Sequence, residues 1–347
     1  MVLYNQRKKS RFELTLSKQI GNRKLKSMSW PMNTMIMFDF YRFFKANGTI
    51  KYAKTTMTKE WGPYFDEVVI LYKDFLITVK PDREFDTTTY ITVYHRSEVK
   101  IRDMWNGLEE WMIKNSTFRS KQFLFPGFHR PKMSKIVFSD SRSKDIIEAN
   151  TTLFFRNLDK LRAHKLKTKR GIILYGSPGN GKTSICRWIS QNSPDVTRIW
   201  ITGWEMRSCN ISELFDIARK LAPSIIFLED LDTAGISRHL TGRINPLLGS
   251  LLNEMDGIEK NDGIVVIATT NNIYALDEAL ANRPGRFDLK IHIGNPHPKI
   301  VKQITGREDN IPLAEAFHRR EEKIYYEKIL GKKYRMPGRR ERVHYIG

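Results

Sequence analysis

Cysteine is scarce in this chain, and long apolar runs are missing. Of its 347 residues only Cys186 and Cys209 are cysteines, too few for a disulfide framework and without metal-ligand spacing. We expect two buried or incidental thiols in a reducing compartment. No stretch approaches about eighteen consecutive apolar residues, so we expect no membrane span. No Cys or acid completes a ligand set beside His292 and His297, which argues against a metal site there.

The N-terminus lacks the apolar segment of a secretory signal after its basic residues. It is basic and poor in acids, so an organellar transit peptide stays open as an alternative. Hydrophobic residues make up 40% of the chain and charged residues 28%, as in folded proteins. We expect a soluble, cytoplasmic protein.

Acidic residues are also few, and the formal net charge is +21. The excess lies at the two ends: residues 1–60 carry 13 Lys and Arg against 3 acids, and residues 298–347 carry 13 against 7. Such charge favours a polyanionic partner, whether nucleic acid, an acidic protein or a membrane surface. The plainer alternative is a solvated basic surface without a dedicated ligand.

The first part of the chain predicts a small α+β domain of unknown role, residues 1–125. Apolar runs between Lys51 and Tyr94 predict strands separated by polar turns. Apolar residues at three- and four-residue spacing then predict a helix over Glu98–Lys114, with Ser97 as its N-cap. The aromatic members of this stripe are interpreted as core.

A Pro/Gly-containing stretch, Phe125–Lys132, marks the predicted domain boundary. A helix is predicted over Ser143–Lys167, with an apolar face that includes Ile146, Ile147, Phe154, Leu158 and Leu161. Five short β runs then alternate with helical segments, which predicts a parallel sheet with crossover helices over residues 126–296. Residues 297–347 are basic and helical, and form a predicted short lid.

Residues Gly176–Thr183 read GSPGNGKT, a full match to the phosphate-binding pattern G-x4-G-K-[ST] between a strand and a helix. The glycines let the backbone N–H groups face the phosphates. Lys182 places a positive charge on the β- and γ-phosphates, and the Thr183 hydroxyl ligates Mg²⁺. The pattern predicts a site for ATP with Mg²⁺, made by Gly176, Ser177, Pro178, Gly179, Asn180, Gly181, Lys182, Thr183 and Ser184.

A second apolar strand, SIIFL, ends in Glu229 and Asp230. Acids at the carboxyl end of a buried parallel strand beside a phosphate loop stand where a Mg²⁺ ligand and a water-activating base are needed. Two adjacent buried acids without a function would cost too much desolvation energy to be incidental. The alternative, that an acid caps the next helix, fits Asp232 better than it fits the pair.

Polar residues follow the third strand, GIVVIAT, and two arginines follow them. The cluster Thr269–Asn272 is either turn chemistry or a means to orient the attacking water. Farther on, Arg283 and Arg286 flank a Pro-Gly turn. In a protein with a phosphate loop, such arginines suit the stabilisation of charge on a transferring phosphoryl group.

These four motifs, in this order, resemble the AAA ATPase module with its second region of homology, over about half of the chain. The resemblance implies a five-stranded sheet, ATP hydrolysis with Mg²⁺ and assembly into a ring, a hexamer or heptamer. It implies that Glu229 is the Mg²⁺ ligand and Asp230 the base of the Walker B pair, and that Asn271 is sensor 1. Arg283 and Arg286 fall on the arginine fingers, which act on the ATP of the neighbouring subunit.

The chain departs from the common AAA pattern in three places. Its acids read Glu-Asp instead of Asp-Glu, which shortens the base at Asp230 by one methylene and resembles the subfamily of the mitochondrial chaperone that translocates the folded Rieske protein. The segment Trp204–Ile211 is shorter than in protein-threading members and lacks their aromatic pore loop. We therefore expect no threading, and expect Trp204 and Met206 to be packed instead of lining a pore. The lid offers no assignable sensor-2 arginine.

Three functions are weighed. The subfamily resemblance favours a chaperone-like ring ATPase that remodels or moves a protein or complex. The +21 charge favours a nucleic-acid-directed motor or loader as the alternative, although no recognised DNA-binding motif supports it. A nucleotide-binding scaffold with little hydrolysis is a third hypothesis, based on the Glu-Asp order.

Overall fold

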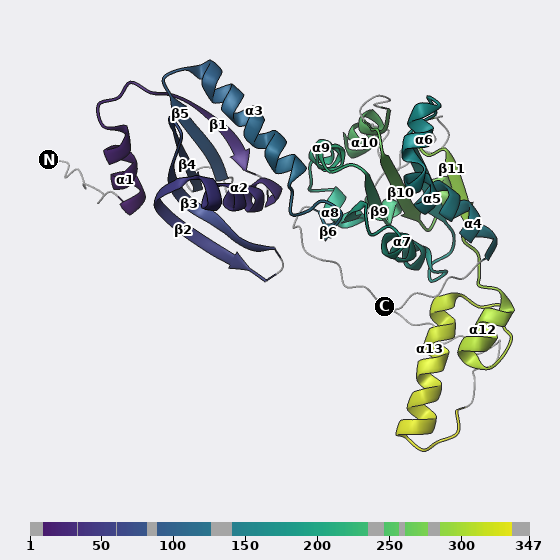
Figure 1. Cartoon of the computed structure of the whole chain (residues 1–347). Helices are drawn as coiled ribbons and strands as arrows, with labels where there is room; N and C mark the ends of the chain where they lie inside the picture. The colour runs from purple at the N-terminus through teal and green to yellow at the C-terminus, as the bar shows by residue number, and fades with distance from the viewer. Residues whose placement is uncertain are drawn as a thin grey trace. The chain divides into compact units, whose positions relative to one another are not determined.

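A computed structural model of the chain shows its arrangement (Figure 1). It describes residues 10–32, 34–59, 61–81, 89–125, 141–234, 246–256, 261–276 and 285–334. The chain divides into two compact units, residues 1–130 and 131–347. The boundary predicted at residues 125–132 lies outside the described residues except for its first position. None of the described helices has the length and apolar character to cross a membrane.

The first unit is built on an antiparallel sheet with the strand order β1-β5-β4-β3-β2. Its strands are β1 (Lys26–Met32), β2 (Thr49–Thr58), β3 (Gly62–Tyr72), β4 (Phe75–Pro81) and β5 (Thr89–His95). Its other elements are the helices α1 (Arg11–Ile20), α2 (Thr34–Asn47) and α3 (Glu98–Lys114), and the short strand β6 (Gln122–Leu124).

The strands predicted after Lys51 and the helix Glu98–Lys114 are confirmed. Ser97 caps α3, because its hydroxyl accepts a hydrogen bond from the backbone N–H of Lys100 at 3.5 Å. The elements α1, β1 and α2, which precede Lys51, were not predicted. Local chemistry accounts for the start of α1: Ser10 and Glu13 form a reciprocal capping box with bonds of 3.2 and 2.9 Å.

An aromatic core joins the helices of the first unit to its sheet. Phe40 and Phe44 of α2 are fully buried, and Trp105 of α3 stacks on Trp30 of β1 with ring centroids 4.3 Å apart. Trp111 is partly buried against the same core. The predicted interpretation of the aromatic stripe on α3 as core is therefore confirmed.

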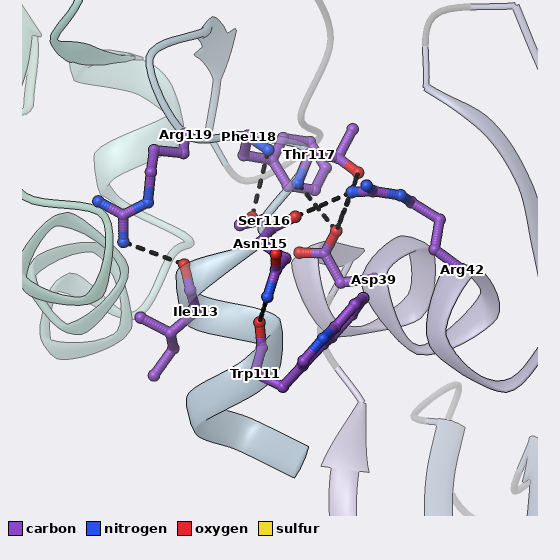
Figure 2. Close-up of polar contacts among 9 residues, drawn as sticks. All are labelled: Asp39, Arg42, Trp111, Ile113, Asn115, Ser116, Thr117, Phe118 and Arg119. Carbon is purple, nitrogen blue, oxygen red and sulfur yellow. Dashed lines mark hydrogen bonds and ion pairs between the residues drawn. The ribbon is translucent and has the colours of Figure 1, made fainter. Parts of the chain in front are cut away.

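A buried carboxylate ties α2 to the segment that follows α3 (Figure 2). Asp39 is fully buried, and its Oδ1 accepts hydrogen bonds from the backbone N–H and the hydroxyl of Thr117, both at 2.9 Å. Arg42, one turn later, donates to the Asn115 carbonyl at 2.9 Å and to the Thr117 hydroxyl at 2.8 Å. Burial raises the pKa of Asp39, while its hydrogen bonds oppose that shift. These contacts fix the end of α3 against α2.

The second unit contains a parallel sheet with the order β11-β7-β10-β9-β8. Each strand corresponds to one of the predicted β runs. The strands are β7 (Lys169–Tyr175), β8 (Thr197–Thr202), β9 (Ser224–Glu229), β10 (Ile264–Thr270) and β11 (Leu289–His292). The central strand β10 is buried along its whole length, as expected of a strand covered on both faces. The predicted α/β fold with five parallel strands and crossover helices is confirmed within the described part of this unit.

The prediction of one continuous helix over Ser143–Lys167 is wrong. The structure has three short helices in this region: α4 (Ser141–Asn150), α5 (Thr152–Arg156) and α6 (Leu158–Ala163). The breaks fall at Thr151 and Asn157. Their side chains donate to the carbonyls of Ile147 at 2.6 Å and Leu153 at 2.8 Å, four residues earlier, and so compete with regular helix bonding. Ile146 also departs from the predicted apolar face, since it is exposed.

The remaining described elements of this unit are helices and short helical turns, of which α12 and α13, in the predicted lid region, pack against each other (Figure 1). They are α7 (Lys182–Gln191), α8 (Gly203–Met206), α9 (Ile211–Lys220), the 3₁₀ turn η1 (Leu231–Ala234), α10 (Pro246–Asp256), η3 (Ile273–Ala275), α12 (Pro298–Thr305), α13 (Leu313–Ile324) and the π-helical η4 (Tyr325–Ile329). The lid helix α13 begins at the phosphate loop, where the N–H of Ala314 donates to the Gly179 carbonyl at 3.0 Å.

Candidate active site

The loop between β7 and α7 has the geometry of an anion cradle. Gly176, Gly179 and Gly181 have φ angles of 151°, 79° and 93°. Residues other than glycine rarely adopt such angles. A Cβ at Gly176 would also run into the Ile293 carbonyl. Gly181 is the N-cap of α7 and provides no side-chain cap, so the first N–H groups of this helix stay available to phosphate oxygens.

Lys182 is the first residue of α7, and it is almost completely buried. Its Nζ donates to the carbonyls of Gly176 at 2.8 Å and Ser177 at 3.1 Å, and to the Asn271 side-chain oxygen at 2.8 Å. Burial lowers the pKa of Lys182, and the carboxylate of Asp230 opposes the shift. The structure thus brings together the predicted phosphate-binding lysine and the predicted sensor 1.

The other predicted loop residues shape the cradle. Asn180 is buried, and its Nδ2 donates to the Ile293 carbonyl at 3.1 Å, which anchors the loop to the end of β11. Ser177 and Pro178 are exposed on the loop, and Ser184 is half-buried on the first turn of α7.

Two side chains with oxygen atoms that can ligate a metal lie close together: Glu229 at the end of β9 and Thr183 in the first turn of α7. Glu229 is largely buried, and its Oε1 has no hydrogen-bond partner within the described part of the chain. Burial raises the pKa of Glu229, while a hydrogen bond with the Thr183 side chain opposes the shift. A carboxylate and a hydroxyl are hard oxygen ligands of the kind that Mg²⁺ prefers, so these two residues fit the predicted cation site.

Asp230, the next residue, is exposed and has a left-handed backbone with φ of 54°. Its N–H donates to the Thr269 hydroxyl at 2.9 Å, which fixes this unusual conformation against the end of β10. Although Asp230 is exposed, its carboxyl is partly desolvated by the surrounding loops, and this desolvation raises the pKa of Asp230; the neighbouring Asp232 adds to the shift, and Lys182 opposes it.

Sequence reasoning missed the contact between Asp232 and Asn271. The Asp232 carboxylate accepts hydrogen bonds from the backbone N–H of Asn271 at 3.3 Å and from the Asn271 side-chain amide at 3.2 Å. The sequence offered helix capping as its best interpretation, whereas these bonds join two different loops. The only signal in the sequence was an acid two residues beyond the pair Glu229-Asp230, which by itself names no partner.

Of the two predicted arginines, only Arg286 lies among the described residues, and it is not brought to the phosphate loop of the same chain. Arg283 lies outside the described residues. Arg286 is buried, and its guanidinium binds Asp256 at the end of α10 through two hydrogen bonds of 2.8 and 2.6 Å. Its backbone lies against Gly171 near the start of β7. The phosphate loop begins five residues farther along that strand, about 16 Å away at strand spacing.

The segment after β8 contacts the turn that carries Asp230. Gly203 leaves no room for a side chain, since a Cβ there would collide with the Thr233 hydroxyl and the Asp230 carbonyl. Met206 is fully buried, as predicted. Trp204 is 74% exposed, so the expectation that it is packed is wrong. The guanidinium of Arg207 lies 5.6 Å from the centroid of its ring.

Other metal and thiol chemistry finds no support among the described residues. Nowhere in that part of the chain do three or more His, Cys, Asp or Glu side chains gather as a metal-binding group. Cys186 is buried, and burial raises the pKa of Cys209 to about 11, so neither thiol is activated.

Comparison with known proteins identifies the region that contains these residues. Residues 172–295 match the family model of the ATPase family associated with various cellular activities (AAA). This part of the chain is therefore an AAA domain, the class that its phosphate loop and parallel sheet define.

Several curated proteins are similar over this region. An ATP-dependent zinc metalloprotease FtsH 2 of Thermoanaerobacter sp. is 41% identical over 173 residues, which cover 47% of this chain and 34% of the relative. The 26S proteasome regulatory subunit 8 homolog B of Arabidopsis thaliana is 39% identical over 158 residues, 41% of this chain and 37% of the relative. The Cell division cycle protein 48 homolog of Archaeoglobus fulgidus is 38% identical over 160 residues, 43% and 22% of the two chains. The chain thus spans about a third or less of each of these relatives.

Proposed function

We propose that this chain binds Mg·ATP in its phosphate loop and hydrolyses it. The observation that carries the proposal is the convergence of three separate segments, which carry Lys182, the pair Glu229-Asp230 and Asn271, around one loop whose glycine backbone suits phosphate. AAA domains are ATP-binding modules, and the domain match supports the choice of nucleotide.

Nucleotide binding would begin with an exchange of partners at Lys182. Without a ligand its ammonium is satisfied by two loop carbonyls and the Asn271 oxygen. Phosphate oxygens are stronger acceptors than these neutral groups, so Lys182 would turn to the β- and γ-phosphates. The N–H groups of the glycine loop and of the first turn of α7 would bind the remaining phosphate oxygens.

Mg²⁺ would be held by Thr183 and Glu229. The unpartnered buried Oε1 of Glu229 is the observation that favours a cation here, because a buried carboxylate oxygen without a donor is otherwise unfavourable. When bound, Mg²⁺ would supply positive charge that neutralises the charge developing on the phosphate oxygens.

Asp230 would accept the proton of the attacking water. Its raised pKa, caused first by burial and then by the Asp232 carboxylate, makes it a stronger base than an ordinary aspartate. The Asn271 side chain would orient this water from the far side of the γ-phosphate. The shorter side chain of Asp230, compared with the glutamate common in the family, is consistent with slow turnover.

A ring arrangement would complete the site. Arg286 lies far from the phosphate loop of its own chain, so a role for it in hydrolysis requires the ATP of a neighbouring subunit. We propose a hexameric or heptameric ring on this ground and on the family resemblance. The Glu-Asp order at 229–230 further favours the subfamily of the Rieske-protein translocating chaperone.

A protein client is the favoured target of the motor. The similar proteins are named as proteases, a proteasome subunit and a cell division protein, which act on or belong to protein-handling assemblies. Exposed Trp204, beside the turn that carries Asp230, offers an aromatic contact for a polypeptide. The net charge of +21 favours nucleic acid as the second candidate.

The test is phosphate release by the purified chain and by Asp230→Asn. We expect the wild type to hydrolyse ATP, and Asp230→Asn to bind ATP with unchanged affinity but to lose hydrolysis. Equal turnover of the two proteins would refute the catalytic assignment and favour the scaffold hypothesis. Stimulation by DNA that weakens steeply with salt would favour the nucleic-acid motor, whereas stimulation by unfolded or folded protein alone would favour the protein client.

A further inference from the structure

We propose that Asp232 is a positioning residue for hydrolysis, which fixes the side-chain amide of Asn271 so that its oxygen faces the phosphate loop. The inference rests on the ATPase activity proposed above and adds a residue to that site. Asp232 lies in η1, after β9, and Asn271 follows β10. Because β9 and β10 are paired in parallel, their carboxyl ends meet and bring these two loops together.

Two groups of opposite hydrogen-bonding character hold the Asn271 amide. The Asp232 carboxylate, an acceptor, receives the Nδ2 of Asn271 at 3.2 Å and its backbone N–H at 3.3 Å. The Lys182 ammonium, which can only donate, reaches Oδ1 of Asn271 at 2.8 Å. A side-chain amide has one donor end and one acceptor end, so only one of its two orientations satisfies both neighbours.

This orientation matters once Lys182 has moved to phosphate. The Asn271 oxygen then loses its donor and becomes a free acceptor next to the γ-phosphate position. An attacking water needs an acceptor there that draws its hydrogen away from the phosphorus and turns its lone pair toward it. The amide NH₂ group cannot accept. Asp232 accepts a hydrogen bond from the NH₂ group of Asn271. This bond prevents a rotation of the amide that would turn the NH₂ group, instead of the oxygen, toward the phosphate loop.

Asp232 would in this way affect the chemical step and not the binding of ATP. Within the described part of the chain, the hydrogen bonds of Lys182 go to Gly176, Ser177 and Asn271, and none goes to Asp232. Loss of an orienting partner behind a residue that contacts the reacting group reduces turnover about 10- to 100-fold.

The experiment measures ATP affinity and turnover for Asp232→Ala and Asp232→Asn, with Asp159→Ala as the matched control. Asp159 has a side chain that is 95% exposed, and it pairs only with Arg162 on the surface of α6. We expect Asp232→Ala to bind ATP within about twofold of the wild type and to lose about 10- to 100-fold in kcat. Asp232→Asn retains the shape and one acceptor oxygen, so a smaller loss is expected. The control should match the wild type.

A double-mutant cycle separates positioning from a general structural role. If Asp232 acts mainly through Asn271, most of the effect of Asp232→Ala on kcat disappears once Asn271→Ala is present, and only the smaller effect of removing its charge beside Asp230 stays. Independent, multiplied effects of the two substitutions would overturn the inference, as would unchanged kcat in Asp232→Ala or a loss of ATP affinity that matches the loss of kcat. If Asp232→Ala does not fold, the same cycle is run with Asp232→Asn, and the same outcomes decide. A wild type without any ATPase activity would overturn the proposed function itself, whereas these other outcomes leave it intact.

Discussion

The ion pair between Arg286 and Asp256 allows a test of whether Arg286 stabilises its own chain, serves a neighbouring subunit, or does both. Two charge-assisted hydrogen bonds of 2.8 and 2.6 Å join the side chains, and Arg286 is only 4% exposed. Removal of one partner from a fully buried pair costs about 3–5 kcal/mol. Because the Asp256 side chain is 42% exposed, water compensates in part, and we expect about 2 kcal/mol for either single substitution.

Urea unfolding of the full chain, followed by tryptophan fluorescence, measures this loss for Arg286→Ala, Asp256→Ala and the double variant. We expect similar losses for both single variants and, for the double variant, a loss smaller than the sum of the two, because both single substitutions remove the same ion pair. A wild-type stability for Asp256→Ala would contradict the ion-pair reasoning.

The ATPase rates of the same variants address the finger hypothesis. We expect Arg286→Ala to bind ATP but to hydrolyse it poorly, and a mixture with Asp230→Asn subunits to recover some activity. Asp256→Ala should retain hydrolysis, because it leaves the arginine in place. If Asp256→Ala loses hydrolysis as completely as Arg286→Ala, the loss comes from the broken ion pair, and the finger role of Arg286 is refuted.

Three further predictions follow from the remaining contacts. Burial raises the pKa of Asp39 above its ordinary value of 3.8. The stability that this group contributes is therefore fully present below pH 3.8 and is lost as pH rises through the raised pKa. Asp39→Asn should flatten this part of the stability–pH profile in thermal melts. Trp204→Ala should change stability by less than about 0.5 kcal/mol but reduce client-stimulated ATPase, since the ring is exposed; an unchanged stimulation would contradict a client contact. Gly203→Ala should lower kcat more than ATP affinity, because the added Cβ displaces the Asp230 carbonyl; equal kinetics would show that the turn tolerates the shift.

The sequence predicted those features that depend on neighbouring residues along the chain. The phosphate loop follows from its glycine spacing, the parallel strands from their apolar runs, and α3 from the three- and four-residue spacing between Ser97 and Lys114. In each case the residues that determine the structure lie within a few positions of one another, so the pattern is visible without knowledge of the fold.

Two kinds of feature were missed or mistaken: helix breaks made by short polar side chains, and contacts between residues far apart in the sequence. The breaks at Thr151 and Asn157 arise from side-chain bonds that compete with a helix of otherwise suitable period. The bonds between Asp232 and Asn271 join residues 39 positions apart, and those between Arg286 and Asp256 join residues 30 apart. No local pattern specifies such partners, since they meet only because the elements beside them are packed together in the fold.

The central claim is that the loop Gly176–Thr183 binds Mg·ATP. Isothermal titration calorimetry of the full chain with a non-hydrolysable ATP analogue and Mg²⁺ tests it most directly, with Lys182→Ala as the comparison. The account predicts saturable binding at micromolar concentrations by the wild type and none by Lys182→Ala. Absence of binding by a folded wild type, or equal binding by Lys182→Ala, would contradict it.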